Sequence, residues 1–205
     1  MSEKSDKTKI KISAVIMASG HSRRFQGNKL WVDFMGTPVV QHAMNNVNND
    51  CFSSVSVVTR DPKICSLAET YGYKGVLNPD TTNDTAVTIR LGIRSLPKDS
   101  DGCAFFVADQ PFLKQSSIRG ITDLFRENSG NICMMEFDGQ RGNPVIFPRK
   151  LFEELVSLQP NEQGKAVIKR HPDLVLTYRP ESITELFDID YRKDLEELAK
   201  LVGRS

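Results

Sequence analysis

Residues 15–30 read VIMASGHSRRFQGNKL, and they join an apolar run to a short segment rich in glycine and basic residues. That segment holds two glycines and three cations, namely Gly20, Gly27, Arg23, Arg24 and Lys29. Glycine lets backbone N–H groups approach a bound group closely, and the planar fork of arginine suits phosphate oxygens. A loop of this kind after a strand can cradle a phosphate. The alternative is a solvated basic loop, which composition alone favours slightly.

The loop matches neither of two common phosphate-binding motifs. The pattern G-x-x-x-x-G-K-[ST] is absent, and so is G-x-G-x-x-G. The rest of the chain must therefore decide between a phosphate site and a solvated loop.

The apolar residues before the loop belong to a predicted strand, and its near-continuous hydrophobicity suits burial on both faces. Downstream, apolar runs alternate with segments of helical period. Strands are predicted over residues 10–18, 54–60, 74–78, 102–109, 131–137, 142–147, 174–178 and 185–190. Helices are predicted over residues 38–47, 61–72, 83–96, 115–125, 149–158, 164–171 and 191–202, with N-caps at Asp61 and at Asn83 or Asp84.

Strands that alternate with helices at this spacing indicate βαβ units, and therefore an α/β fold with a mostly parallel sheet and helices on both faces. In such sheets, ligands bind outside the carboxyl ends of the strands. Residues 19–29, 78–84 and 109–111 all begin at predicted carboxyl ends. We therefore expect these three loops to meet at one edge of the sheet.

Length and composition are those of a single globular domain. The chain has 205 residues, with 27 Lys and Arg against 26 Asp and Glu, so nothing suggests a nucleic-acid binder. No apolar stretch approaches the length of a membrane span, and the first residues lack the apolar core of a signal peptide. We expect a disordered lead over residues 1–10, one domain over residues 11–203, and a cytoplasmic protein.

The loop pattern A-S-G-x-S-R-R-F-x-G-x-K-L resembles the L-A-x-G-x-S-x-R-M/F-G-x-x-K-L signature of the MobA-like nucleotidyltransferases. Among them, it looks most like the molybdenum cofactor cytidylyltransferases. Five further segments resemble the family in the expected order, at residues 77–93, 105–113, 139–155, 163–175 and 187–198. This resemblance implies a Rossmann-like, three-layer nucleotidyltransferase fold with a mostly parallel, mixed sheet.

The resemblance also implies a Mg²⁺ site. Asp109 follows a buried apolar strand, and Asp190 lies at the end of the segment D-I-D, predicted to be a second strand end. Both match metal ligands of the family, and Mg²⁺ needs few protein oxygens when phosphates and water complete its shell. From the residues alone, Asp109 could equally cap the following turn, and Asp190 could cap the last helix. Asp188 is expected to be a structural partner.

The remaining roles are likewise implied by the resemblance. The catalytic residues would be Arg24, Lys29 and Asp109. Nucleotide binding would involve Ala18, Ser19, Gly20, Ser22, Arg23, Arg24, Lys29, Asn78 and Thr88. Acceptor binding would involve Gly142, Asn143 and Pro144, although Asn143 replaces a histidine common in the family. Asn78 could equally be part of a turn only.

The implied reaction is transfer of CMP from CTP to the terminal phosphate of molybdenum-bound molybdopterin, with release of pyrophosphate and with a molybdenum hydroxylase as possible partner. Ser19 stands at the position that differs between cytidylyl and guanylyl members, so the base stays open, and the small side chain favours cytosine mildly. Three alternatives remain: a guanylyltransferase for the same cofactor, a sugar- or alcohol-phosphate nucleotidyltransferase, and a non-catalytic cofactor chaperone.

Overall fold

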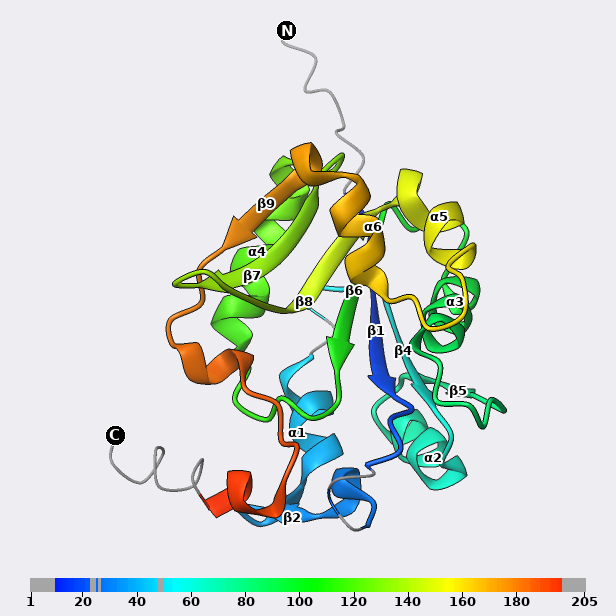
Figure 1. Cartoon of the computed structure of the whole chain (residues 1–205), viewed down its shortest axis with the longest axis vertical. Helices are drawn as coiled ribbons and strands as arrows, with labels where there is room; N and C mark the ends of the chain where they lie inside the picture. Colours follow the sequence, from blue (N-terminus) through cyan, green and yellow to red (C-terminus); the bar gives the residue numbers. More distant parts are fainter. Residues whose placement is uncertain (1–9, 23–24, 26, 48–49, 197–205) are drawn as a thin grey trace, which may run out of the picture.

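A central mixed sheet organises the computed structural model, which describes residues 10–22, 25, 27–47 and 50–196 (Figure 1). Seven strands of the described part form this sheet in the order β5-β4-β1-β6-β8-β7-β9. They are β1 (Ile12–Ala18), β4 (Ser54–Thr59), β5 (Lys74–Leu77), β6 (Gly102–Val107), β7 (Ile132–Phe137), β8 (Gln140–Pro148) and β9 (Val175–Tyr178). Within this sheet, as far as the structure describes the chain, the pairs of β8 with β6 and with β7 are antiparallel and the other pairs are parallel. The predicted mostly parallel, mixed sheet is confirmed.

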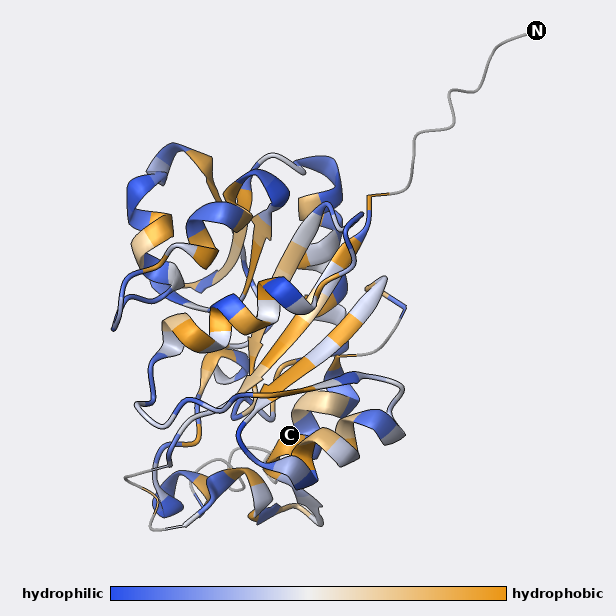
Figure 2. Ribbon diagram, turned by 90° about the vertical axis from the view of Figure 1, so that its right-hand side faces the viewer, coloured by the Kyte–Doolittle hydropathy of each residue, from blue (hydrophilic) through white to orange (hydrophobic). Residues whose placement is uncertain are grey.

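Helices cover both faces of the sheet, which gives three layers. They are α1 (Val39–Asn46), α2 (Pro62–Thr70), α3 (Thr85–Ser95), α4 (Gln115–Glu127), α5 (Phe152–Val156) and α6 (Gly164–Arg170). Buried residues of α1, α2 and α4 share one apolar cluster, and those of α3, α5 and α6 share another. Along β1, Ala14 and Ile16 pack into the first cluster and Val15 into the second. Because both faces of β1 are buried, its sequence is a nearly continuous run of apolar residues (Figure 2).

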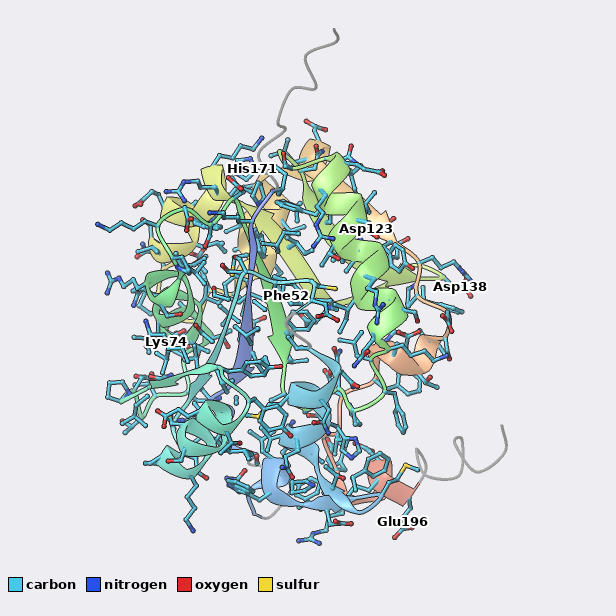
Figure 3. All side chains as sticks on the ribbon, turned by 180° about the vertical axis from the view of Figure 1, so that it is seen from behind. Phe52, Lys74, Asp123, Asp138, His171 and Glu196 are labelled. Atoms are coloured by element: carbon cyan, nitrogen blue, oxygen red, sulfur yellow. The ribbon has the colours of Figure 1, made fainter. Side chains whose placement is uncertain are left out.

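Aromatic side chains fill the interior of the first cluster. The ring centroids of Phe52 and Phe106 lie 5.6 Å apart in an edge-to-face arrangement, a geometry that aromatic pairs prefer. Figure 3 shows Phe52 over the middle of the sheet, whereas Asp123 and Asp138 lie at the surface. No helix in the described part of the chain is both long enough and apolar enough to cross a membrane.

Both predicted N-caps are confirmed at their residues. Asp61 Oδ1 accepts the backbone N–H of Lys63 at 2.9 Å, and Asp84 Oδ1 accepts that of Ala86 at 2.9 Å. Three short elements were not predicted: the 3₁₀ turn η1 (Lys29–Trp31) and the two strands of a small hairpin, β2 (Asp33–Phe34) and β3 (Thr37–Pro38). A further 3₁₀ turn, η3 (Pro172–Leu174), precedes β9.

Three predicted elements differ from the structure or extend beyond it. The predicted helix over 149–158 is divided into a 3₁₀ turn, η2 (Arg149–Leu151), and α5. The last predicted helix is helical at residues 192–196, and its remainder lies outside the described residues. The predicted lead over residues 1–10 also lies outside the described residues, apart from Ile10. The extent of the domain, predicted as residues 11–203, stays a prediction.

The predicted strand over residues 185–190 is wrong. A 3₁₀ turn, η4 (Ile183–Leu186), is followed by residues 187–190, which are extended and pair with no strand of the described part of the chain. Leu186 and Ile189 are apolar and buried, and their apolar character led to the prediction of a strand. They are buried because this part of the chain crosses the end of the sheet. A single backbone bond joins the segment to the residues after β6, from Ile189 N–H to the carbonyl of Asp109 at 3.0 Å.

Residues 183–190 form the crossing segment, and the buried carboxylate of Glu185 fixes this segment in place. Its oxygens accept the backbone N–H groups of Lys114 at 3.0 Å, Glu181 at 3.0 Å and Ser182 at 3.3 Å. Glu185 is fully buried, and a buried charge is tolerated when hydrogen bonds satisfy it. The carboxylate therefore holds the segment against the start of α4.

The close packing of β6 against α4 yields a stability prediction. A Cβ on Gly102 would lie 2.5 Å from ring carbons of Phe125, which is fully buried. Gly102→Ala must therefore displace the ring or the strand, and we expect a loss of about 1–3 kcal/mol in unfolding free energy, measured by urea denaturation. Gly130→Ala is the control, because among the described residues its Cβ would meet only Lys150 Nζ, at 3.8 Å. Equal stability of the two variants would contradict the packing described here.

Candidate active site

A cleft of about 430 Å³ lies at the carboxyl ends of β1, β4, β5 and β6. The loops after these strands line it, together with Asp190 from the crossing segment. Most of the predicted site residues line this cleft: Ala18, Ser19, Gly20, Ser22, Lys29, Asn78, Thr88, Asp109 and Asp190. The structure therefore brings together residues that are up to 172 positions apart (18 to 190). Arg23 and Arg24 lie outside the described residues.

The loop after β1 leaves open space above its glycine. Among the residues that the structure describes, no atom lies within 4 Å of a Cβ built on Gly20, so packing against them does not require glycine there. The buried Ser19 hydroxyl donates to the carbonyl of Val58 at 3.1 Å. The side chain of Ser19 is thus engaged with β4, and its backbone borders the cleft.

Arg60 is a cleft residue that the sequence analysis missed. It follows β4, and its guanidinium donates to the carbonyls of Ser19 at 2.6 Å and Asp80 at 3.3 Å. It also donates to Asn83 Oδ1 at 3.1 Å, and this same oxygen accepts the backbone N–H of His21 at 3.1 Å. Arg60 therefore ties the loop after β1 to the loop after β5. Arg60 is the last residue of the strand predicted over residues 54–60, so its position at a predicted carboxyl end was the available signal.

Asn78 and Thr88 form a buried polar pair on the far wall of the cleft. Asn78 Nδ2 donates to Thr88 Oγ1 at 3.2 Å, and Asn78 Oδ1 accepts the backbone N–H of Asp80 at 2.9 Å. Asn78 is therefore a turn residue, as the alternative interpretation held, and also a cleft residue.

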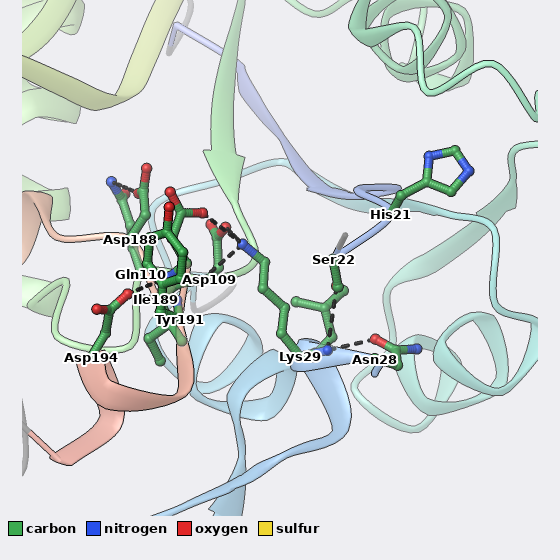
Figure 4. A network of polar contacts seen from close by, with 12 residues as sticks. His21, Ser22, Asn28, Lys29, Asp109, Gln110, Asp188, Ile189, Tyr191 and Asp194 are labelled. Atoms are coloured by element: carbon green, nitrogen blue, oxygen red, sulfur yellow. Dashed lines mark hydrogen bonds and ion pairs between the residues drawn. The ribbon is translucent and has the colours of Figure 1, made fainter. Parts of the chain in front are cut away.

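Lys29 lies at the centre of the polar contacts at the other end of the cleft (Figure 4). Its Nζ donates to Asp109 Oδ2 at 2.5 Å, to the carbonyl of Ile189 at 2.9 Å and to Asp190 Oδ1 at 3.5 Å. The side chain of Lys29 is 12% exposed and that of Asp109 is 18% exposed. Burial by itself would lower the pKa of Lys29, but the charges and hydrogen bonds of Asp109 and Asp190 together outweigh it and raise that pKa above its usual value.

A neighbouring carboxylate, Asp188, is held by Gln110. The Gln110 amide donates to Asp188 Oδ1 at 2.9 Å and to the carbonyl of Leu186 at 3.3 Å. Loss of solvation within the surrounding protein raises the pKa of Asp188 to about 6, and the negative charge of Asp109 adds to this increase. Asp188 thus has the structural contact expected of it, and Gln110 is a second residue that the sequence analysis missed.

Asp190 does not lie at a strand end, because the crossing segment is not a strand. The N–H groups of Asp190 and Tyr191 donate to Asp194 Oδ2 at 2.8 Å and 2.7 Å. The Asp194 carboxylate therefore accepts the backbone N–H groups at the start of the last helical residues. The Asp190 carboxylate lies near Lys29 Nζ.

The two carboxylates around Lys29 fit a magnesium ion that arrives with phosphates. Asp109 and Asp190 come from different segments and present oxygens to one position. Mg²⁺ is usually held by one or two carboxylates when phosphates and water complete its shell. Across the described ranges, no group of three or more His, Cys, Asp or Glu side chains could hold a metal together. This finding is compatible with a two-carboxylate site.

The predicted acceptor residues Gly142, Asn143 and Pro144 do not line this cleft. They lie near the start of β8, where Val145 pairs antiparallel with Phe105 of β6. The antiparallel direction places them at the same edge of the sheet as Asp109. A Cβ on Gly142 would lie 3.0 Å from Leu186, so this part of β8 packs against the crossing segment.

The turn that carries Lys29 is anchored to the start of α2 by Asp61. Asp61 Oδ2 accepts the indole N–H of Trp31 at 2.7 Å and the amide of Asn28 at 3.4 Å. Asn28 Oδ1 in turn accepts the backbone N–H of Leu30 at 3.2 Å. One carboxylate therefore caps α2 and positions η1.

Known proteins similar to this chain include nucleotidyltransferases. A family model described as the MobA-like NTP transferase domain matches residues 14–175. A probable molybdenum cofactor guanylyltransferase of Natranaerobius thermophilus is 21% identical, over 95% of this chain and 98% of its own length. A 3-deoxy-manno-octulosonate cytidylyltransferase of Francisella tularensis is 29% identical, over 58% of this chain and 47% of its own length.

Solved structures confirm the predicted Rossmann-like fold. Rv0371c from Mycobacterium tuberculosis matches with a TM-score of 0.80 at 22% identity, over 93% of this chain and 98% of that chain. The same protein in complex with manganese matches with a TM-score of 0.71 at 20% identity, over the same shares of the two chains.

The double role of Asp61 can be separated by two substitutions. Asp61→Ala removes the cap and should lower the unfolding free energy by about 1 kcal/mol, whereas Asp61→Asn keeps an oxygen for the cap and should stay close to wild type. Asparagine has only one acceptor oxygen, so both variants should change the fluorescence of Trp31, the only tryptophan. Unchanged emission in both would show that Asp61 does not hold the turn.

Proposed function

The chain belongs to the MobA-like NTP transferase family, and we propose that it transfers CMP from CTP to the terminal phosphate of molybdenum-bound molybdopterin, releasing pyrophosphate. Membership of this family makes the chain a nucleotidyltransferase. One observation carries the proposal: Lys29, Asp109 and Asp190 converge at one end of a cleft whose wall is the open, glycine-containing loop after β1. This arrangement suits a triphosphate and its counter-ions.

In this reaction the protein mainly positions the substrates and stabilises the phosphate charges. The acceptor phosphate oxygen attacks the α-phosphorus in line, and the bond from that phosphorus to the pyrophosphate oxygen breaks. Backbone N–H groups around Gly20, the Lys29 ammonium and Arg24 would hold the triphosphate and stabilise the leaving charge. Asp109 and Asp190 would hold Mg²⁺, which neutralises phosphate charge when bound.

GTP is the second candidate for the nucleotide substrate. The Ser19 hydroxyl already donates to Val58, so we do not expect it to distinguish cytosine from guanine. Similarity to a cytidylyltransferase supports CTP, but the matched region is 47% of that relative. The guanylyltransferase relative is matched over 98% of its length, which supports GTP.

The acceptor and the setting of the reaction stay predictions. Gly142, Asn143 and Pro144 lie at the sheet edge beside Asp109, and the guanylyltransferase relative supports a molybdopterin-type acceptor. Mg²⁺ is the proposed ion, and a neighbour in fold has been solved with manganese. A molybdenum hydroxylase as partner and a cytoplasmic location remain expectations.

Pyrophosphate release tests the reaction and the base together. The purified protein is incubated with Mg²⁺, a molybdopterin-type acceptor and CTP, GTP, ATP or UTP in parallel. We expect release with CTP. Release with GTP alone would retain the chemistry and replace the base, whereas binding of nucleotide without release from any of the four would contradict the proposed acceptor.

Asp109→Asn tests the metal role. We expect kcat to fall by about 10²-fold or more, because the amide cannot replace a charged oxygen ligand, while circular dichroism should show a folded protein. Asp99→Asn is the matched control: Asp99 also pairs with a lysine, Lys11, at 2.5 Å, but that pair is exposed and precedes β6. Near-normal turnover of Asp109→Asn with Mg²⁺ would contradict the assignment.

A further inference from the structure

The ammonium of Lys29 occupies the position that the proposed metal ion would take. Its three oxygen contacts are one carboxylate oxygen of Asp109, one of Asp190 and the carbonyl of Ile189, at 2.5, 3.5 and 2.9 Å. An ammonium has three N–H donors, so these contacts use its full donor capacity. Figure 4 shows the side chain reaching from η1 toward these acceptors.

A second cation cannot join these carboxylates without a cost. The Lys29 side chain is 12% exposed, so water screens its charge poorly. A divalent ion bound to Asp109 and Asp190 would face a like charge at close range, and such repulsion is strong where the dielectric is low. The ammonium must therefore leave before the ion can bind well.

The contacts of Lys29 make such a movement local. Its backbone N–H donates to Ser22 Oγ at 3.3 Å, and the turn that carries it is tied to Asp61 through Asn28 and Trp31. The four-carbon stem beyond this anchor is flexible, and it borders the cleft. The ammonium can thus turn toward a bound anion while the turn stays in place.

Building on the proposed function, we propose that Lys29 is an internal counter-ion that closes the metal site until a triphosphate draws its ammonium away. Metal alone then binds weakly, and nucleotide and metal bind cooperatively. Because coupling between two sites is reciprocal, each ligand strengthens the other by the same factor. The step is an exchange of ionic contacts, with no bond made or broken.

Binding of Mn²⁺ alone, followed by electron paramagnetic resonance, tests the inference without any turnover. Lys29→Met and Lys29→Gln remove the charge, and we expect each folded variant to bind Mn²⁺ about 10-fold or more tightly than wild type. Lys29→Arg keeps a cation and should stay weak. Addition of Asp109→Asn to either neutral variant should abolish the gain, which locates the ion.

Lys11→Met is the matched control, because Lys11 also pairs with a carboxylate, Asp99, at 2.5 Å, outside the cleft. Its Mn²⁺ affinity should equal that of wild type. If the neutral variants of Lys29 also bind Mn²⁺ no better than wild type, the counter-ion role is wrong, even for an enzyme that transfers nucleotides. If they bind Mn²⁺ more tightly but the wild-type protein transfers no nucleotide, the counter-ion role stands and the proposed function fails.

The wild-type protein provides a test that needs no variant. Mn²⁺ and CTP, with GTP in parallel, should each strengthen the other's binding beyond the affinity of Mn²⁺ for the free nucleotide. Binding of the two ligands without such coupling would overturn the inference.

Discussion

The contact between Lys29 and Asp109 is the constraint on which the site depends. These residues are 80 positions apart in the chain, and two neighbouring parallel strands bring them together. Met17 of β1 pairs with Val107 of β6, so the loops that follow both strands begin side by side. The parallel register therefore makes the ion pair possible, because an antiparallel neighbour would have placed Asp109 at the opposite edge of the sheet.

Asp190 reaches the same position by a different physical route. Among the described residues, no strand pairs with the crossing segment. It is held by the buried carboxylate of Glu185, the amide of Gln110 and a backbone hydrogen bond to Asp109. A strand would have presented alternate side chains to opposite faces. The irregular segment can instead bury Leu186 and Ile189 and still direct the Asp190 carboxylate toward Lys29.

The sequence allowed the fold to be predicted wherever the signal was local. Continuous apolar runs marked the central strands, and the N-caps at Asp61 and Asp84 marked helix starts. The error at residues 185–190 arose because burial against a sheet end produces the same pattern as burial within a sheet. Arg60 and Gln110 were missed because their roles depend on partners 20 to 78 positions away, which no local pattern reveals.

The resemblance assigned Lys29 to phosphates and Asp109 to a metal, whereas the structure pairs them with each other. Both descriptions follow from one requirement. A charged side chain that is shielded from water needs a partner of opposite charge. An isolated buried charge is far more costly than a paired one. A cation that would hold a polyanion and carboxylates that would hold a metal ion are complementary in charge, and in this cleft Lys29 pairs with Asp109 and Asp190. The resemblance predicts which ligands these groups bind, and the geometry of this chain shows the contacts that they make with one another.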